Sequence, residues 1–125
     1  MSLDVKVDFG AMFRNDDRAY DVEAGTVIFK DGDPGDCLYV ILDGEVDIRV
    51  HDHHVWRLQA GELFGEMALV EARPRSALAV AHSRCRLVAI DERRFLFLVA
   101  QTPFFALGLL RLLATRLRAM DETVA

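Results

Sequence analysis

The chain has 125 residues, of which 52% are hydrophobic, and it carries a formal net charge of −5. This length and composition favour one domain over residues 1–125 with a packed core, and they exclude a disordered chain. The acidic balance also excludes a general nucleic-acid-binding protein, which needs a basic surface to bind phosphates and release their counterions.

The N-terminus and the two cysteines predict a cellular location. No uninterrupted apolar stretch is long enough to cross a bilayer, and the N-terminus lacks the basic and apolar regions of a signal peptide. Cys37 and Cys85 have no metal-ligand spacing, so we interpret them as reduced, mostly buried thiols. We therefore predict a cytoplasmic protein without a membrane partner.

From about residue 20 to residue 90 the chain has the pattern of short strands and turns. Residues 45–50 alternate between charged and apolar side chains, which predicts one buried face, whereas the apolar run 37–42 predicts a strand covered on both faces. The Asp43-Gly44 pair between these runs predicts a tight hairpin, and residues 31–36 form a dense turn cluster. Further strands are expected at residues 26–30, 54–59, 76–81 and 86–90. Many short strands with regular turns favour an antiparallel jelly roll over about residues 19–90.

After Asp91 the pattern changes to helix. Acidic residues suit the start of a first helix, and Thr102 followed by Pro103 suits the start of a second one that ends at about Asp121. The last helix carries two apolar stripes. The first is a heptad seam formed by Ala106, Leu110, Leu113, Leu117 and Met120, and the second is formed by Phe105, Leu109 and Leu112. One stripe can pack on the jelly roll, and the other favours a homodimer through this helix.

The segment from Phe64 to Ala77 carries the residues that point most clearly to a ligand. Arg75 offers a planar fork of donors that matches phosphate oxygens, and Ser76 beside it offers a hydroxyl. Glu66, at the start of a predicted helical turn, suits a ribose hydroxyl, and Gly65 permits close backbone approach. The segment therefore predicts a ligand that contains both a ribose 2′-hydroxyl and a phosphate.

These residues resemble the phosphate-binding cassette of the cyclic nucleotide-binding domains found in catabolite-activator-type regulators, protein-kinase regulatory subunits and cyclic-nucleotide-gated channels. The resemblance covers the chain from about Phe9 to Met120. Turn glycines at Gly25, Gly32, Gly35, Gly44 and Gly61 also match this family. The resemblance implies a mainly β fold, a double-stranded β-helix of the jelly-roll β-roll kind. A short N-terminal helix and two C-terminal helices over about residues 91–121 would flank it.

The resemblance also implies roles for individual residues. Arg75 would bind the cyclic phosphate, Glu66 the ribose 2′-hydroxyl, and the last helix would close over the base. The implied ligand-binding residues are Phe64, Gly65, Glu66, Met67, Ala68, Arg75, Ser76, Ala77, Met120 and Asp121. Because serine rather than threonine follows Arg75, cAMP is the expected ligand and cGMP the alternative. The implied function is a sensor or regulatory module without enzymatic activity, cofactor or metal.

The sequence departs from the family pattern in three places. Leu78 stands where many relatives have threonine, and the loop of residues 70–73 contains no glycine. The chain also ends soon after the last predicted helix, which leaves no room for a helix-turn-helix domain. We therefore expect no DNA binding by this chain alone, and a signal that passes to an output protein whose identity the sequence does not reveal.

Two alternatives remain open. The cassette residues could have structural roles only, with Glu66 as a helix cap or a partner of Arg75, in an interaction module that does not respond to ligand. His51, His53 and His54 could instead hold a metal in a cupin-like enzyme. The carboxylate that such a site needs is missing from residues 55–58, so an exposed hairpin tip is the favoured interpretation.

Overall fold

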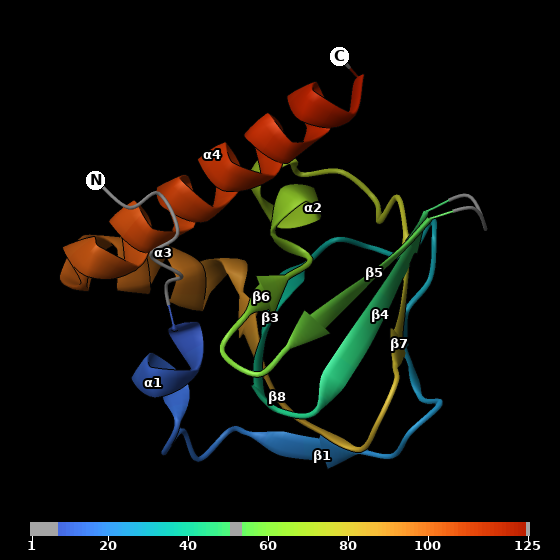
Figure 1. Cartoon of the computed structure of the whole chain (residues 1–125). Helices are drawn as coiled ribbons and strands as arrows, with labels where there is room; N and C mark the ends of the chain where they lie inside the picture. Colours follow the sequence, from blue (N-terminus) through green and yellow to red (C-terminus); the bar gives the residue numbers. More distant parts are fainter. Residues whose placement is uncertain (1–7, 51–53, 125) are drawn as a thin grey trace. The chain divides into compact units, whose positions relative to one another are not determined.

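The computed structural model describes residues 8–50 and 54–124, with side chains except at residues 54, 55 and 120–124. It divides the chain into two compact units, one from Asp8 to Glu92 and one that contains the C-terminal helices from Arg93 onward (Figure 1). Each unit is described separately below.

The first unit contains two antiparallel four-stranded sheets, in the strand orders β1-β8-β3-β6 and β2-β7-β4-β5. Their bounds are β1 (Tyr20–Val22), β2 (Val27–Phe29), β3 (Cys37–Asp43), β4 (Glu45–Val50), β5 (His54–Gln59), β6 (Leu63–Phe64), β7 (Leu78–Ala81) and β8 (Cys85–Asp91). The predicted jelly-roll β-roll is confirmed. The short strands β1 and β6 were not predicted individually, because two or three residues are too few to show an alternating pattern.

A short helix, α1 (Phe9–Phe13), precedes the β-roll, as the family resemblance implied. The Asp8 carboxylate caps it by accepting a hydrogen bond from the Ala11 N–H at 3.2 Å. The Phe9 N–H donates to the Gly61 carbonyl at 2.9 Å, which ties this helix to the turn before β6.

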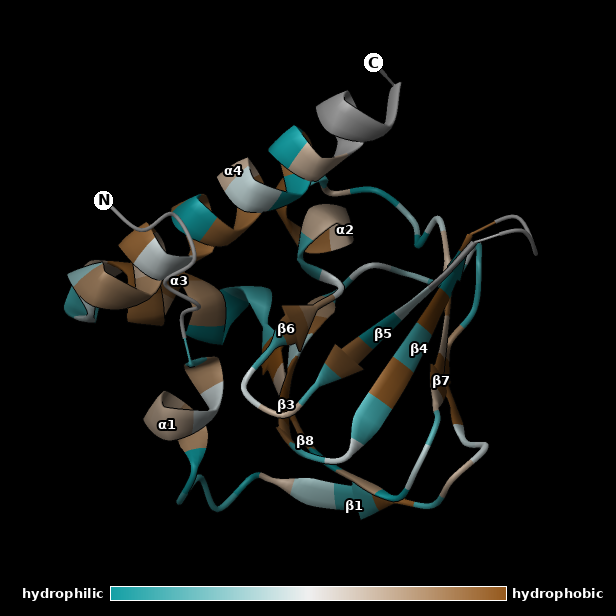
Figure 2. Cartoon of the chain, viewed as in Figure 1, coloured by the Kyte–Doolittle hydropathy of each residue, from teal (hydrophilic) through white to brown (hydrophobic). Residues whose placement is uncertain are grey.

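Hydrophilic and hydrophobic residues alternate along β4 (Figure 2), and its apolar side chains face the core of the β-roll. Val46 is fully buried in the core, and Ile48 packs against it. The opposite face is less exposed to solvent than the sequence predicts, because Asp47 is only 4% exposed. Its cross-strand neighbour Arg57 donates from Nε to its carboxylate at 2.8 Å and covers it.

The prediction of a hairpin at Asp43-Gly44 is wrong, because β3 and β4 belong to different sheets. Gly44 has a φ of 91° and lies against the backbone of Arg84 and Cys85, where a side chain would collide. The left-handed glycine therefore turns the chain from one sheet into the other instead of joining two paired strands. The predicted hairpin between β4 and β5 does form, with Val50 paired to His54, although its tip at residues 51–53 lies outside the described residues.

An irregularity in β2 decides which way Phe29 points. Val27 pairs with Val80, whereas Phe29 pairs with Ala79, so the register shifts between the two β2 residues. Without this bulge, residues two apart would share one face of the sheet. With it, Val27 is 49% exposed and Phe29 is buried in the core of the β-roll.

The C-terminal unit contains two helices, with α3 spanning Glu92–Gln101 and α4 spanning Pro103–Val124. The break at Thr102 and the start at Pro103 agree with the sequence prediction, and the Phe95 and Phe105 rings pack edge to face across this break at 6.0 Å. Helix α4 extends three residues beyond the predicted end at Asp121, where no glycine or proline stops it.

The two predicted stripes of α4 differ in exposure. Phe105 and Leu109 of the second stripe are buried, whereas Leu110 and Leu117 of the heptad seam are 63% and 60% exposed. Among the described residues, no single helix is both long and apolar enough to span a bilayer. Only α3 and α4 taken together meet both the length and the composition criteria, and this pair is bent by 111°.

Candidate functional site

The cassette is built around α2 (Glu66–Glu71), which begins directly after β6 and a left-handed glycine. Gly65 has a φ of 78°, and Ala72 ends the helix with a φ of 54°. Among the described residues, Ala72 is the only non-glycine residue with a positive φ, a conformation that glycine adopts more easily. The Arg73 N–H then donates to the Ala68 carbonyl at 3.0 Å, which folds the following loop back onto α2.

Arg75 is the central residue of the cassette, and it is only 3% exposed. Its Nη1 donates to the carbonyl of Gly65 at 2.6 Å, and its Nη2 donates to the carbonyl of Cys37. Its Nε is buried and has no acceptor within hydrogen-bond distance among the described residues. The guanidinium is therefore fixed in position, and its Nε–H is still unused.

Aromatic rings support the guanidinium on one side. Its carbon lies 4.3 Å from the centre of the Phe29 ring and 5.7 Å from that of Tyr39. Tyr39 stacks on Phe64, with ring centres 5.2 Å apart. Burial raises the pKa of the Tyr39 hydroxyl and of the Cys37 thiol, so both groups are uncharged at neutral pH and neither neutralises Arg75.

The turn of residues 31–36 holds the cassette loop through its backbone. The Arg75 N–H donates to the Asp33 carbonyl at 2.8 Å, and the Gly32 N–H donates to the Arg75 carbonyl at 2.8 Å. Gly35 lies so close to Ala68 and to the Arg73 carbonyl that a side chain there would collide with both. The dense turn cluster of the sequence is therefore a support for α2 and for Arg75.

Arg75 differs electrostatically from Arg57, Arg84 and Arg86 of the β-roll. No ion pair among the described residues involves Arg75, although a buried charge is costly unless it is paired. Arg57, by contrast, has Asp47 at 2.8 Å, and Arg84 and Arg86 share Asp21 at 3.3 and 3.2 Å. Arg75 is thus a buried cation that the described part of the chain leaves without an anion.

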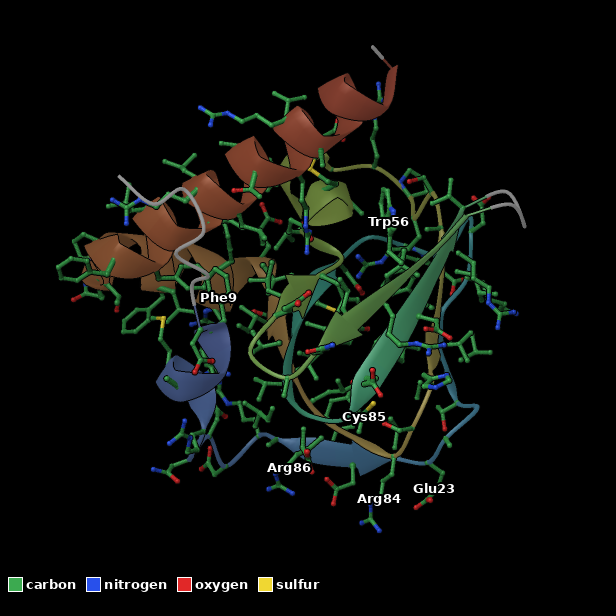
Figure 3. The ribbon with its side chains drawn as sticks, viewed as in Figure 1. Phe9, Glu23, Trp56, Arg84, Cys85 and Arg86 are labelled. Carbon is green, nitrogen blue, oxygen red and sulfur yellow. The ribbon has the colours of Figure 1, made fainter. Side chains whose placement is uncertain are left out.

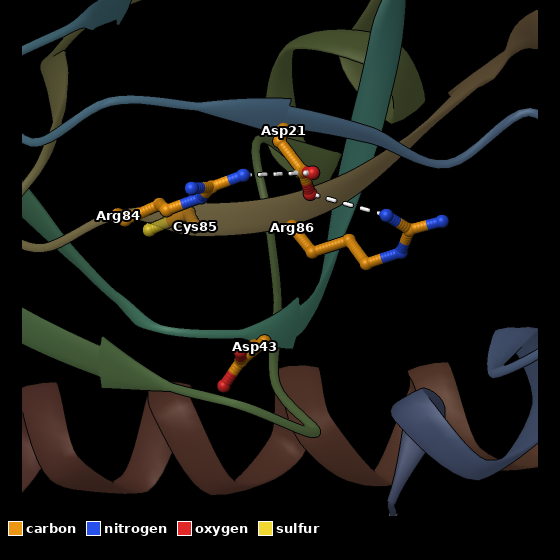
Figure 4. A pocket seen from close by; sticks show the side chains of 5 residues that line it. All are labelled: Asp21, Asp43, Arg84, Cys85 and Arg86. Atoms are coloured by element: carbon orange, nitrogen blue, oxygen red, sulfur yellow. Dashed lines mark hydrogen bonds and ion pairs between the residues drawn. The ribbon is translucent and has the colours of Figure 1, made fainter.

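A cavity of about 350 Å³ lies away from the cassette, near the start of β8. Figure 3 places Arg84, Cys85 and Arg86 together in this region. The close-up in Figure 4 shows Asp21 between the two arginines, with Asp43 also lining the cavity. Its two arginines and two carboxylates balance in charge, and Arg84 and Arg86 are largely exposed. We therefore place the candidate site at the cassette.

The structure brings some of the predicted site residues together. Gly65 and Arg75 are hydrogen-bonded, and Phe64 stacks on Tyr39, whose ring centre lies 5.7 Å from the guanidinium carbon. The other predicted cassette residues are buried Glu66, half-buried Ala68 and Ala77, and exposed Met67 and Ser76. Met120 and Asp121 belong to α4, but their side chains lie outside the described residues.

Three residues that hold Arg75 were not predicted from the sequence, namely Phe29, Cys37 and Tyr39. They lie on β2 and β3, more than 30 residues before the arginine, and come near it only when the two sheets form the β-roll. No local motif marks them. The aromatic character of Phe29 and Tyr39, within two predicted strands, is the one signal that the sequence offers.

Within the part of the chain that the structure describes, no group of three histidine, cysteine or acidic side chains could hold a metal ion. His51 and His53 lie outside the described residues, and the side chain of His54 is not described. The alternative that this cluster binds a metal is therefore not tested.

The fold and the site together define a β-roll ligand-binding domain whose buried arginine suits an anion. The family model for the cyclic nucleotide-binding domain matches residues 19–102. The chain belongs to this family, which confirms the resemblance seen in the sequence.

Two curated relatives and one solved structure illustrate the similarity. The chain is 40% identical over 102 residues to the cyclic AMP receptor protein of Thermus thermophilus, which covers 78% of this chain and 47% of that protein. It is 32% identical over 110 residues to a CRP-like cAMP-activated global transcriptional regulator of Mycobacterium tuberculosis. This match covers 84% of this chain and 49% of that protein. The crystal structure of the Thermus thermophilus catabolite activator protein matches with a TM-score of 0.77 and 37% identity, covering 85% of this chain and 52% of that one. The chain thus spans about half the length of the curated relatives it matches.

Proposed function

We propose that this domain is a sensor that binds cAMP, with cGMP as a second ligand, and that Arg75 holds the cyclic phosphate. The observation that carries this proposal is the buried guanidinium with an unused Nε and no ion pair among the described residues. A phosphate would give this donor an acceptor and the cation a counter-charge, in the charge-assisted geometry that arginine favours. The names of the Thermus and Mycobacterium relatives support cAMP as the first ligand to test.

The remaining cassette residues have roles that follow from their positions. We assign Glu66 to the ribose 2′-hydroxyl and the exposed hydroxyl of Ser76, next to Arg75, to the phosphate. The N–H groups of Gly65 and Ala77 complete the contacts to ribose and phosphate. Phe64, Met67 and Ala68 would move with the ordered cassette, and Met120 and Asp121 would contact the base when α4 closes. This mechanism is a population shift toward a closed state that the ligand binds more tightly.

We further propose that the two units work as one regulatory domain without catalysis of its own, in the cytoplasm, where Cys37 beside Arg75 stays reduced. The signal would leave through α4, by homodimerisation or by contact with an output protein. The exposed Leu110 and Leu117, seven residues apart, support a helix-to-helix contact. A monomer in analytical ultracentrifugation, both with and without cAMP, would contradict the homodimer.

Calorimetric titration with cAMP and then cGMP tests the ligand, using protein that has been unfolded, stripped of bound nucleotide and refolded. We expect binding at micromolar strength or tighter, which corresponds to about −8 kcal/mol or better. Arg75→Gln should weaken binding by about 10- to 100-fold, as expected for the loss of charge-assisted hydrogen bonds.

Arg73→Gln is the matched control, because it removes the same charge from an exposed position two residues away. It should leave the affinity within about twofold of wild type, since an exposed charge contributes little. Equal affinities of the Arg75 and Arg73 variants would contradict the site assignment. No heat and no thermal stabilisation of the folded wild type with either nucleotide would favour the interaction module.

A further inference from the structure

The C-terminal unit exposes large apolar side chains on both of its helices. None of the α3 residues is buried, and its exposed residues 93, 96, 97 and 100 recur at helical spacing on one face. On this face Leu96 is 59% exposed and Phe97 is 63% exposed. On α4, Phe104 is 82% exposed and Leu107, three residues later on the same face, is 41% exposed. We call these four side chains the apolar corner. Exposed apolar side chains that cluster in this way mark an interaction surface.

The apolar corner lies around the bend of 111° between α3 and α4. Phe97 and Leu107 are each five residues from Thr102 at the bend, which is about 8 Å along either helix. Arg93 and Arg111 are each nine residues from Thr102, about 14 Å along either helix, and both are exposed. Figure 2 shows hydrophobic colour around the joined ends of the two helices and hydrophilic patches farther along α4. The exposed surface therefore changes from apolar at the bend to basic on both arms.

The charge of this segment is opposite to that of the rest of the chain. Residues 93–125 contain five arginines, one aspartate and one glutamate, a net charge of +3, whereas the whole chain carries −5, so residues 1–92 carry −8. Both acidic residues of the segment come after Met120, so every charged residue within residues 93–120 is an arginine. The same surface of a second copy would therefore repel this one, and an anionic partner would be attracted.

We propose that the apolar corner inserts into the surface of a bilayer that contains anionic lipids, with Arg93 and Arg111 at the level of the lipid phosphates. A bilayer combines an anionic surface with an apolar interior, which are the two properties that this face complements. Interfacial helices bury their apolar face by about 5–10 Å and keep basic side chains at the headgroups. This depth agrees with apolar side chains within about 8 Å of the bend and arginines beyond them.

This inference differs from the sequence prediction that the protein has no membrane partner. That prediction considered a segment that spans the bilayer, whereas insertion at the surface needs none. The members of the apolar corner are also not part of the heptad seam of α4, so the proposed homodimer uses other residues. The inference does not depend on the nucleotide, and cAMP binding is measured separately.

Sedimentation with lipid vesicles tests the inference. We would mix the full chain with vesicles of phosphatidylcholine alone, or of phosphatidylcholine with phosphatidylglycerol, at low and at high salt. The variants are Phe104→Ser for the apolar corner and Arg111→Gln for the basic arm. Tyr20→Ser and Arg84→Gln are the matched controls, because they remove an aromatic ring that is 39% exposed and an arginine side chain that is 67% exposed from the β-roll.

We expect wild type to sediment with the anionic vesicles and not with the neutral ones, and high salt to weaken this binding. Phe104→Ser should weaken it by about 10- to 100-fold, the range for one buried phenylalanine side chain. Arg111→Gln should weaken it by about fivefold, as expected for one basic residue at an anionic surface. Both control variants should bind the vesicles within about twofold of wild type.

Three results would overturn the inference. They are no sedimentation of wild type with anionic vesicles, equal binding to neutral and anionic vesicles, and equal binding of Phe104→Ser and Tyr20→Ser. If Phe104→Ser does not fold, the same comparison with Phe97→Ser decides. A wild-type dimer that Phe104→Ser converts to a monomer in analytical ultracentrifugation, without vesicle binding by either protein, would assign this surface to a second copy instead.

Discussion

The guanidinium carbon of Arg75 lies 4.3 Å from the centre of the Phe29 ring. Phe29 reaches this place because the bulge in β2 turns it inward, away from the exposed side that Val27 occupies. The cation is thus oriented by a strand that belongs to a different part of the sequence.

Phe29→Leu should weaken cAMP binding by about 3- to 30-fold, because leucine retains an apolar side chain but removes the ring face that attracts the cation. Ile41→Val, in the same core cluster, is the control for a general loss of packing, which typically costs about 0.5–1.5 kcal/mol. Calorimetry gives the affinities, and urea unfolding gives the stabilities. If both variants bind cAMP equally well at similar stability, Phe29 does not orient Arg75 for the ligand.

Gly65→Ala should lower both stability and affinity. Its φ of 78° is strained for alanine by about 1–2 kcal/mol, and the added Cβ would lie 2.8 Å from Nη1 of Arg75. Gly25→Ala separates the two effects, because Gly25 has a similar φ of 88° but no atom within 4 Å of the added Cβ. Both variants should therefore lose stability, whereas only Gly65→Ala should lose affinity. Equal affinity in the two variants would show that the guanidinium tolerates displacement.

Asp47 should make the β-roll sensitive to acid. The hydrogen bond from Arg57 holds the pKa of the Asp47 carboxyl below its ordinary value of about 3.9, and the Nδ1 of His82 lies 3.4 Å from its Oδ2. A lowered carboxyl pKa stabilises the folded state at pH values above the unfolded pKa, and this contribution is lost as the pH falls through the folded pKa.

Urea unfolding between about pH 7 and pH 2 tests this expectation. Asp47→Asn should be less stable than wild type at neutral pH, and the difference should shrink in acid. Asp21→Asn, which removes a carboxylate paired with two exposed arginines, should have a smaller effect at neutral pH. A gap between wild type and Asp47→Asn that stays constant with pH would contradict the role of the carboxylate charge.

The sequence allowed the strands with clear alternation to be predicted closely. The bounds of β4 and β5 agree with their predictions, and in β4 the period of two is visible in the residues because one face of the strand meets the core. The Asp43-Gly44 turn was predicted as a hairpin because its residues fit a tight turn, but Gly44 joins two sheets instead. Local turn chemistry permits both outcomes, and the sheet arrangement decides between them.

The cassette could be predicted in part. Arg75 and Gly65 were identified from local sequence, and their hydrogen bond brings them together as a site requires. The support from Phe29 and Cys37 could not be predicted, since it depends on strand pairing across the whole β-roll. The roles of Glu66 and of the other predicted ligand contacts remain predictions until a nucleotide is bound.

The pairing of the first strands with the last ones also sets the order in which the domain can form during synthesis. Tyr20 on β1 pairs with Leu87 on β8, and Phe29 on β2 pairs with Ala79 on β7. A growing chain therefore exposes its early strands until β7 and β8 have left the ribosome, because non-local partners must be made before they can pair. Arg75 emerges just before those closing strands. The pairing of β7 and β8 completes both sheets, so we expect the arginine site to form only when the β-roll is whole.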